Sequence, residues 1–338
     1  CKNGICTGIS NFKIEENMKK VTIVIPNYNG EKYIDECFSA LTKQSYEDFD
    51  VILADNGSED NSISKACQYK DKLDLKIKKL NCNYGFAKAV NEGIRQSQAE
   101  YVILLNNDTH AGRHFVENLL KAIEMEKDVF AAQALMLQYN SPELVDSAGD
   151  YFCGLGVAFS AGKDKKASLY KKKKDIFSAC AGAAIYRRKI FEEIGYFEEE
   201  FFAYLEDVDI CYRAKLFGYR NIFVPDAKVL HVGSASSGSR YNEFKVSLAA
   251  RNSMLLMYKN FAPWQWAVNF IPVLAGITIK AVFFTKKKLL KAYLGGIVSS
   301  FKKMGCMEKT HSDSRRLEYK KVEKELLFNI LVRSGIKE

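Results

Sequence analysis

YVILLNNDT, residues 101–109, joins five apolar or aromatic residues to a short polar group. A run of this length that is rich in β-favouring residues and ends abruptly predicts a buried central strand with polar side chains at its carboxyl end. Open α/β sheets bind their ligands at that edge. Asp108 lies there among amides and a hydroxyl, which are hard oxygen ligands suited to Mg²⁺ or Mn²⁺. We therefore predict Asp108 as a metal ligand. The alternative is that residues 106–109 only form a turn and cap the next helix.

Three apolar runs precede this strand, at 21–25, 51–54 and 75–80, and the first two also end in polar turn residues. Helices with one apolar face are predicted over 31–42 and 86–96. Strands that alternate with helices of this length predict right-handed βαβ crossovers and a mostly parallel sheet. A crevice large enough for a nucleotide would then lie over the carboxyl ends of the strands.

Composition limits the possible classes of function. The chain has 338 residues, enough for one or two domains, and its net charge of +9 suits nucleic acid, an anionic membrane or an anionic small substrate. Nine cysteines without paired CxxC spacing predict a reducing, cytoplasmic environment without disulfides or a zinc site. No GxGxxG or Walker-type loop follows a strand, which argues against a nicotinamide dehydrogenase and a P-loop hydrolase.

A second acidic group, EDVD at 206–209, opens a predicted helix after an aromatic segment. The helix dipole favours acids in a first turn, but three carboxylates among aromatics also suit an active site. Before it, 145–162 is predicted as a hairpin or an excursion from the sheet. The lysine-rich 163–174 is predicted as a solvated loop, with contact to phosphate or membrane as the alternative. Small residues over 177–186 permit close approach of the backbone to a ligand or to another element. Further on, His231 lies beside apolar residues, where a lone histidine is more often part of the core than a ligand.

The C-terminal third contains an uncharged segment, 262–279, which begins near two tryptophans and is followed by Lys286, Lys287 and Lys288. Its polar and proline interruptions favour a helix at the membrane interface over a membrane span. The alternative is a buried helical hairpin. We predict a leader outside the fold at 1–17, a catalytic domain at 18–238, and a helical region in contact with the membrane at 239–338.

Several ordered motifs together resemble the family 2 glycosyltransferases, and most closely the bacterial rhamnosyltransferase-like branch that builds surface polysaccharides. The motifs are IPNYNG at 25–30, DNGS at 55–58, NYGFAKAVNEGI at 83–94, LLNNDT at 104–109, FFAYLEDVDICYRA at 201–214 and VLHVGS at 229–234. The resemblance covers roughly 19–259. It implies an α/β GT-A fold, with a mostly parallel nucleotide-binding sheet flanked by helices, and an inverting transfer from a nucleotide-sugar that depends on Mn²⁺ or Mg²⁺.

The resemblance also implies roles for individual residues. Asp108 would bind the ion that bridges the diphosphate, and His231 would complete the metal site. Asp207 would be the catalytic base; Glu206 beside it, like Asp209, would orient the acceptor or pair with Arg213. Asp55 would bind the uracil or thymine, or its ribose. The nucleotide-sugar site as a whole would comprise Pro26, Tyr28, Asn29, Asp55, Gly57, Asn83, Gly85, Lys88, Asn106, Asn107 and Gly182. Asn106 replaces the first aspartate of the family's DXD motif.

These assignments predict an enzyme at the inner face of the plasma membrane. It would move a sugar, with L-rhamnose as a candidate, from a dTDP- or UDP-sugar to a hydroxyl of a glycan or a lipid-linked acceptor. Two rival functions are a catalytically inactive scaffold of the same fold and a basic nucleic-acid-binding protein. The intact Asp55, Asp108 and Asp207 argue against the first rival. The lysine runs lack interleaved aromatics, which argues against the second.

Overall fold

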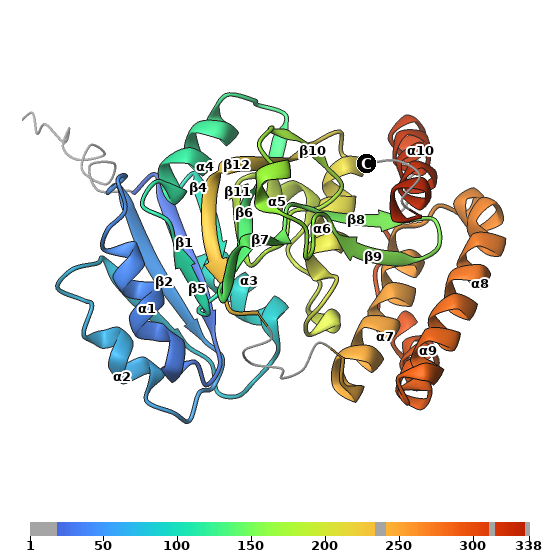
Figure 1. Ribbon diagram of the computed structural model, residues 1–338, viewed down its shortest axis with the longest axis horizontal. Coiled ribbons are helices and arrows are strands. Elements are labelled where there is room, and N and C mark those ends of the chain that lie inside the picture. The colour runs from blue at the N-terminus through green and yellow to red at the C-terminus, as the bar shows by residue number, and fades with distance from the viewer. Residues whose placement is uncertain (1–18, 234–240, 311–314, 335–338) are drawn as a thin grey trace, which may run out of the picture.

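The computed structural model describes residues 19–233, 241–310 and 315–334. The predicted leader, 1–17, lies outside the described residues. Within the described ranges, a ten-stranded sheet forms the centre of the protein, and four long helices stand beside the hairpin β8–β9 (Figure 1).

The N-terminal half of the sheet is parallel, in the order β4-β1-β2-β3. All five residues of β4 are buried, which confirms the predicted central strand, and β3 lies at the edge of the sheet. The strands are β1 (Val21–Asn27), β2 (Phe49–Asp55), β3 (Leu75–Lys79) and β4 (Tyr101–Leu105), and the helices between them are α1 (Glu31–Leu41), α2 (Ser62–Cys67) and α3 (Phe86–Gln96). The short helix α2 was not predicted, because six residues carry too little periodicity.

The other half of the sheet is mixed, so the prediction of a mostly parallel sheet holds only for the first half. β11 (Ala183–Arg187) runs antiparallel to both β4 and β6 (Val129–Gln138), between which it lies. β6 in turn pairs in parallel with β12 (Arg220–His231). β12 is a single strand with an irregularity between Val224 and Lys228, since a bulge can accommodate a proline inside a strand.

Short strands and helices complete this half. Residues 106–109 do not cap the following helix, because β5 intervenes and that helix begins only at Phe115. The remaining elements are β5 (Thr109–Ala111), α4 (Phe115–Glu124), β7 (Ser141–Ser147), the hairpin strands β8 (Asp150–Cys153) and β9 (Val157–Ser160), the 3₁₀ helices η2 (Ala167–Leu169) and η3 (Glu199–Phe201), β10 (Lys174–Ile176), α5 (Ile190–Ile194) and α6 (Glu206–Leu216). The hairpin β8–β9 confirms the expectation for 145–162.

Helices cover both faces of the sheet. Apolar side chains of α1, α2 and α4 form one core with one face of the strands, while α3, α5 and α6 form a second core on the opposite face. A third core joins α6 to the C-terminal helices. These helices are α7 (Glu243–Asn260), α8 (Pro263–Lys286), α9 (Leu290–Met304) and α10 (Arg316–Arg333).

The buried-hairpin alternative for the C-terminal region does not describe α8. Only 17% of its most apolar 18-residue window is buried, and its length and composition would allow it to cross a membrane. Trp264 and Trp266 are both partly buried against the third core. Neither projects fully outward, as a tryptophan that anchors a helix at the membrane interface would. Phe261 and Ala262, just before the two tryptophans, belong to that core, and Trp266 packs edge-on against Phe261.

Candidate active site

Hydrogen bonds between side chains tie together the carboxyl ends of β1, β2 and β4. Asn27 Nδ2 donates to Asp55 Oδ1 at 2.8 Å, and Asn107 Nδ2 donates to Asn27 Oδ1 at 2.7 Å. All three residues are buried. Gly30 has to lack a side chain here, because a Cβ would lie 2.1 Å from Asn107 Nδ2. The structure thus brings together two predicted site residues, Asp55 and Asn107, through Asn27, which was not predicted.

A second network holds the loop at 83–85 against the loop that follows β2. Asn56 Nδ2 donates to Asn83 Oδ1 at 2.9 Å and to the carbonyl of Gly85 at 3.0 Å. Gly57 and Gly85 both have positive φ angles, of 77° and 91°, which favour glycine. These loops place the predicted Gly57, Asn83 and Gly85 at one edge of the sheet. Tyr84, not predicted, is 46% exposed there.

The loop after β1 lies beside the loop after β2. The backbone N–H of Asn29 donates to Ser58 Oγ at 2.9 Å, and Asn29 itself adopts a φ of 49°. Pro26 is the sixth residue of β1 and is partly exposed, while Tyr28 is 40% exposed. An exposed tyrosine and a rigid proline at this edge can form one wall for a planar base.

Lys88 is engaged in ion pairs. Its ammonium lies 3.2 Å from Glu92 Oε1 and 3.3 Å from Glu199 Oε2. Arg95 joins the same group through both carboxylates. Lys88 therefore lies beside the predicted site, but its charge is balanced by carboxylates of α3 and η3 in this arrangement.

Asp108 and His231 face each other, and Asp146 holds the far side of the imidazole. His231 Nε2 lies 3.3 Å from Asp108 Oδ1, and Nδ1 lies 2.8 Å from Asp146 Oδ2. Lys163 also bonds to Asp146. Burial alone would lower the pKa of His231, but hydrogen bonds and charges of the two carboxylates raise it to about 9. At neutral pH an imidazolium thus bridges the two aspartates.

This arrangement fits a divalent ion. Two ligands of one Mn²⁺ or Mg²⁺ ion lie about 3 Å apart, since each is about 2.1 Å from the metal, and this is close to the spacing between Asp108 and His231 Nε2. A carboxylate on the other imidazole nitrogen is the usual partner of a metal-binding histidine, and Asp146 supplies it. Binding an ion at Nε2 would require His231 to release the proton there.

One loop, at residues 181–182, contacts both Asp207 and the residue that follows β4. The N–H of Ala181 donates to Asp207 Oδ2 at 3.4 Å, and the N–H of Asn106 donates to the carbonyl of Gly182 at 2.9 Å. A Cβ on Gly182 would lie 3.0 Å from Asn106 Nδ2, so the loop passes close to that amide. The small residues predicted at 177–186 therefore permit close approach of the polypeptide to itself. They bring Asp207 near Asn106.

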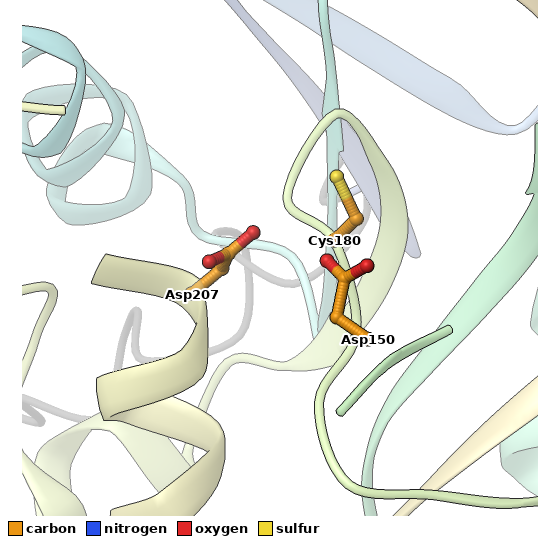
Figure 2. Close-up of side chains that lie close together, drawn as sticks. All are labelled: Asp150, Cys180 and Asp207. Atoms are coloured by element: carbon orange, nitrogen blue, oxygen red, sulfur yellow. The ribbon is translucent and has the colours of Figure 1, made fainter. Parts of the chain in front are cut away.

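Asp150 and Cys180 lie beside Asp207 (Figure 2). All three side chains are partly accessible. Their ligand atoms lie within 4.8 Å of one another, a spacing that could hold a metal ion. The thiol is a softer ligand than Mg²⁺ or Mn²⁺ prefers. Burial, and then the charges of Asp150 and Asp207, raise the pKa of Cys180 well above its usual value. The group therefore fits these hard ions less well than Asp108 and His231 do.

The fold raises the pKa of both carboxyl groups of this cluster. Burial and then the charge of Asp207 raise the pKa of Asp150 to about 7, against hydrogen bonds from Ser160 and Ser147. Burial also raises the pKa of Asp207, although the N–H groups of Val208 and Ala181 oppose the shift. Asp150 was missed because nothing in VDSAGD, residues 145–150, distinguishes its second aspartate.

The neighbours of Asp207 on α6 have different environments. Glu206 is buried, and its Oε2 has no hydrogen-bond partner within the described ranges. Burial and the charge of Asp207 raise the pKa of Glu206 well above its usual value, which favours the neutral acid. Asp209 pairs with Arg213 at 2.8 Å, which confirms the pairing predicted for that residue but not for Glu206.

The family model described as glycosyl transferase family 2 matches residues 22–195, which is just over half of the chain. The chain belongs to glycosyltransferase family 2. The matched region includes Asp55, Asp108 and Asp150 but ends before Asp207 and His231.

Curated relatives of this family 2 chain are bacterial glycosyltransferases. Glycosyltransferase GlyG of Streptococcus pneumoniae is 26% identical over 281 residues, which are 81% of this chain and 87% of GlyG. The poly(ribitol-phosphate) beta-glucosyltransferase of Bacillus spizizenii is 28% identical over 58% of this chain. The aligned region spans only 32% of that relative's length. None of these names assigns the chain to the rhamnosyltransferase-like branch.

Solved structures of low sequence identity share the fold. Staphylococcus aureus TarS 1–349 in complex with UDP-GlcNAc is 19% identical, with a TM-score of 0.57 over 94% of this chain and 92% of that one. The mannosyltransferase PcManGT of Pyrobaculum calidifontis, in complex with GDP-Man and Mn²⁺, is 16% identical, with a TM-score of 0.55 over 84% and 87% of the two chains. The family 2 chain thus has the predicted GT-A-like fold.

Proposed function

We propose that this family 2 protein is an inverting glycosyltransferase. It moves a sugar from a UDP- or dTDP-sugar to a hydroxyl of a glycan or lipid-linked acceptor in cell-surface polysaccharide synthesis. L-Rhamnose is the sugar that the motif resemblance favours. The observation that carries the proposal is the chain of contacts from Asp55 through Asn107 and Asn106 to the loop that holds Asp207. A donor site and a base thereby share one edge of the sheet.

Asp207 has the properties of the base for such a transfer. The acceptor hydroxyl gives its proton to the Asp207 carboxylate while its oxygen bonds to the anomeric carbon, and the sugar–diphosphate bond breaks on the opposite face. One carboxylate is enough, because the leaving diphosphate is already an anion. Asp207 is partly accessible and its pKa is raised, so it can take up a proton from an acceptor. Glu206 is buried and favours its neutral form, which leaves it unsuited to that role.

Asp108 and His231 would hold Mn²⁺ or Mg²⁺, with Asp146 orienting the imidazole. When bound, the ion supplies positive charge that stabilises the departing diphosphate. Asn106, at the first position of the motif, adds a neutral amide oxygen instead of a second charge. Asp108 is therefore the acidic ligand on which ion binding at this site mainly depends.

The outer face of α8 would rest on an anionic membrane surface. Phe270, Ile271 and Leu274 are 60%, 68% and 51% exposed on this helix. Exposed Lys286, Lys287 and Lys288 follow, and their charge complements anionic lipid headgroups.

The inner face of α8 is held by the protein, which argues for a helix that lies on the membrane rather than across it. Gln265 Nε2 and Asn269 Nδ2 both donate to the buried carboxylate of Glu323 on α10 at 2.8 Å. An enzyme placed in this way at the inner face of the plasma membrane could reach a lipid-linked acceptor.

A donor panel tests the proposed function. The protein would be incubated with UDP-GlcNAc, UDP-glucose, dTDP-L-rhamnose and GDP-mannose, with and without Mn²⁺, and release of the nucleoside diphosphate measured. Product from a UDP- or dTDP-sugar, absent in Asp207→Asn, is the expected result, and NMR of that product should show inversion at the anomeric carbon. Turnover of GDP-mannose alone would contradict the proposed donor class. Nucleotide binding without any turnover would instead favour the inactive-scaffold alternative. A protein that binds none of these donors would refute the proposal.

A further inference from the structure

The segment that leads into α6 has a strained backbone. Phe202, Tyr204 and Leu205 have φ angles of 63°, 70° and 68°, a region that side chains with a Cβ rarely adopt. Phe202 has a ψ of −62°, and the N–H of Ala203 donates to the carbonyl of Phe201 at 2.7 Å. These values describe a γ-turn of the rare, positive-φ form. Such a backbone persists only where its surroundings hold it in place.

Asn252, on α7, holds this segment from one side. Its Nδ2 lies 2.9, 2.9 and 2.7 Å from the carbonyl oxygens of Phe201, Ala203 and Tyr204. The residue is fully buried, with 0% of its surface exposed. One side-chain amide therefore contacts three carbonyls of the strained segment, in a place from which water is excluded.

Arg251 fixes the orientation of that amide. Its Nε donates to Asn252 Oδ1 at 3.0 Å, which turns the NH₂ group of Asn252 toward the carbonyls. Its Nη2 adds bonds at 3.0 Å to the carbonyls of Glu200 and Phe201. Arg251 and Asn252 together form a clamp on residues 200–204.

The clamped segment touches both halves of the candidate active site. Leu205 precedes α6 directly, and its carbonyl accepts from the N–H of Asp209 at 2.9 Å, so the segment sets where Asp207 stands. On the other side, the N–H of Ala87 donates to the carbonyl of Phe202 at 3.3 Å. Gly85 approaches so closely that a Cβ there would lie 2.4 Å from the same carbonyl oxygen.

We propose that Arg251 and Asn252 are positioning residues of the transfer reaction, which hold residues 200–204 of the strained segment before α6 and thereby place Asp207 against the loop at 83–85. The inference rests on the proposed function, because it assumes that Asp207 is the base. Without the amide, the segment can relax to ordinary φ angles and α6 can begin elsewhere. A displacement of about 1 Å at a reacting group can reduce turnover about 10²-fold.

The main test is Asn252→Asp, which keeps the size of the side chain but removes the NH₂ donor. We expect kcat to fall at least about 10-fold while the Kd for UDP or dTDP, measured by calorimetry, changes less than about threefold. Hydrogen exchange of residues 199–209 should become faster. Arg251→Lys, which keeps the charge and a donor, should retain more turnover than Arg251→Ala.

Ser253→Ala is the matched control. Ser253 is the next residue on α7, and its Oγ donates at 2.5 Å to the carbonyl of Gly156, in the β8–β9 turn and away from the clamped segment. This variant should lower the melting temperature but leave kcat within about twofold of the parent.

Three results would overturn the clamp. They are a parent-like kcat in Asn252→Asp, an equal loss of kcat in Ser253→Ala, and unchanged hydrogen exchange at 199–209. If Asn252→Asp does not fold, the comparison of Arg251→Lys with Arg251→Ala decides, and equal turnover in both would refute the proposal. If the parent protein transfers no sugar, the proposed function is overturned and the clamp with it. If the parent is active and Asp207→Asn is inactive, the proposed function stands, and the Asn252 and Arg251 variants then test the clamp alone.

Discussion

Replacing Asp150 with asparagine should stabilise the folded protein at alkaline pH more than at acid pH. Burial and the charge of Asp207 raise the pKa of Asp150 from 3.8 to about 7 in the folded state. The fold therefore opposes ionisation of this group. Stability that is present below pH 3.8 is lost progressively as the pH rises toward 7. Asparagine cannot ionise, so Asp150→Asn removes this loss.

The size of the effect follows from the shift. About three pKa units correspond to roughly 4 kcal/mol at pH 8, and the same calculation leaves roughly 1 kcal/mol at pH 4.5. These are upper limits, because Asp150 is partly accessible and its titration is linked to that of Asp207. We therefore expect Asp150→Asn to gain roughly 1–3 kcal/mol of unfolding free energy at pH 8 relative to pH 4.5.

Urea denaturation in metal-free buffer at the two pH values measures the effect. Asp146→Asn is the control, since burial alone would raise the pKa of Asp146 but hydrogen bonds and charges of His231 and Lys163 keep it below its usual value. Removing that carboxylate should destabilise the protein at pH 8, with the opposite sign to Asp150→Asn. Identical pH dependence of stability in the parent and Asp150→Asn would refute the reasoning.

Three further predictions concern catalysis, metal and membrane. Asp207→Asn should reduce kcat by at least about 10²-fold with nucleotide affinity retained, because the amide cannot accept a proton, and near-parent turnover would move the base elsewhere. Asp108→Ala should weaken calorimetric binding of UDP or dTDP mainly when Mn²⁺ is present; equal weakening without the ion would make Asp108 structural. The parent should sediment with phosphatidylglycerol vesicles at low salt, and the double variant Phe270→Ser with Ile271→Ser should stay in the supernatant. If both proteins sediment, or if neither does, the outer face of α8 is not the membrane contact.

The fold class and the position of polar residues at the carboxyl ends of β2 and β4 could be predicted from the sequence. Buried strands such as β4 are recognisable because their apolar residues are consecutive and their ends are marked by turn-forming residues. The helix 86–96 was predicted with its observed bounds because its apolar spacing and the glycine before it are local signals. For the same reason Asp55, Asn107 and Asp108 could be placed at one edge of a sheet before any long-range contact was known.

The direction of β11 and the partners of the site residues came only from the tertiary structure. β11 pairs with strands that lie far from it in sequence, and its small residues show burial but not direction. Asp146 and Asp150 carry no local pattern, yet one meets His231 and the other meets Asp207. Asn252 lies 45 residues beyond Asp207, in a helix whose sequence indicates only that it packs.

The physical reason is the range of the interactions. Strand and helix patterns arise from hydrogen bonds and burial within a few residues, so one local segment contains the whole signal. Ion pairing, desolvation and the hydrogen bonds to the carbonyls of a strained turn depend on distances of a few ångströms between residues that are far apart in sequence. Local sequence thus placed Asp55 and Asp108 at the carboxyl ends of β2 and β4. Only the tertiary structure places the carboxylate of Asp150 beside that of Asp207 and the amide of Asn252 against the turn that precedes α6.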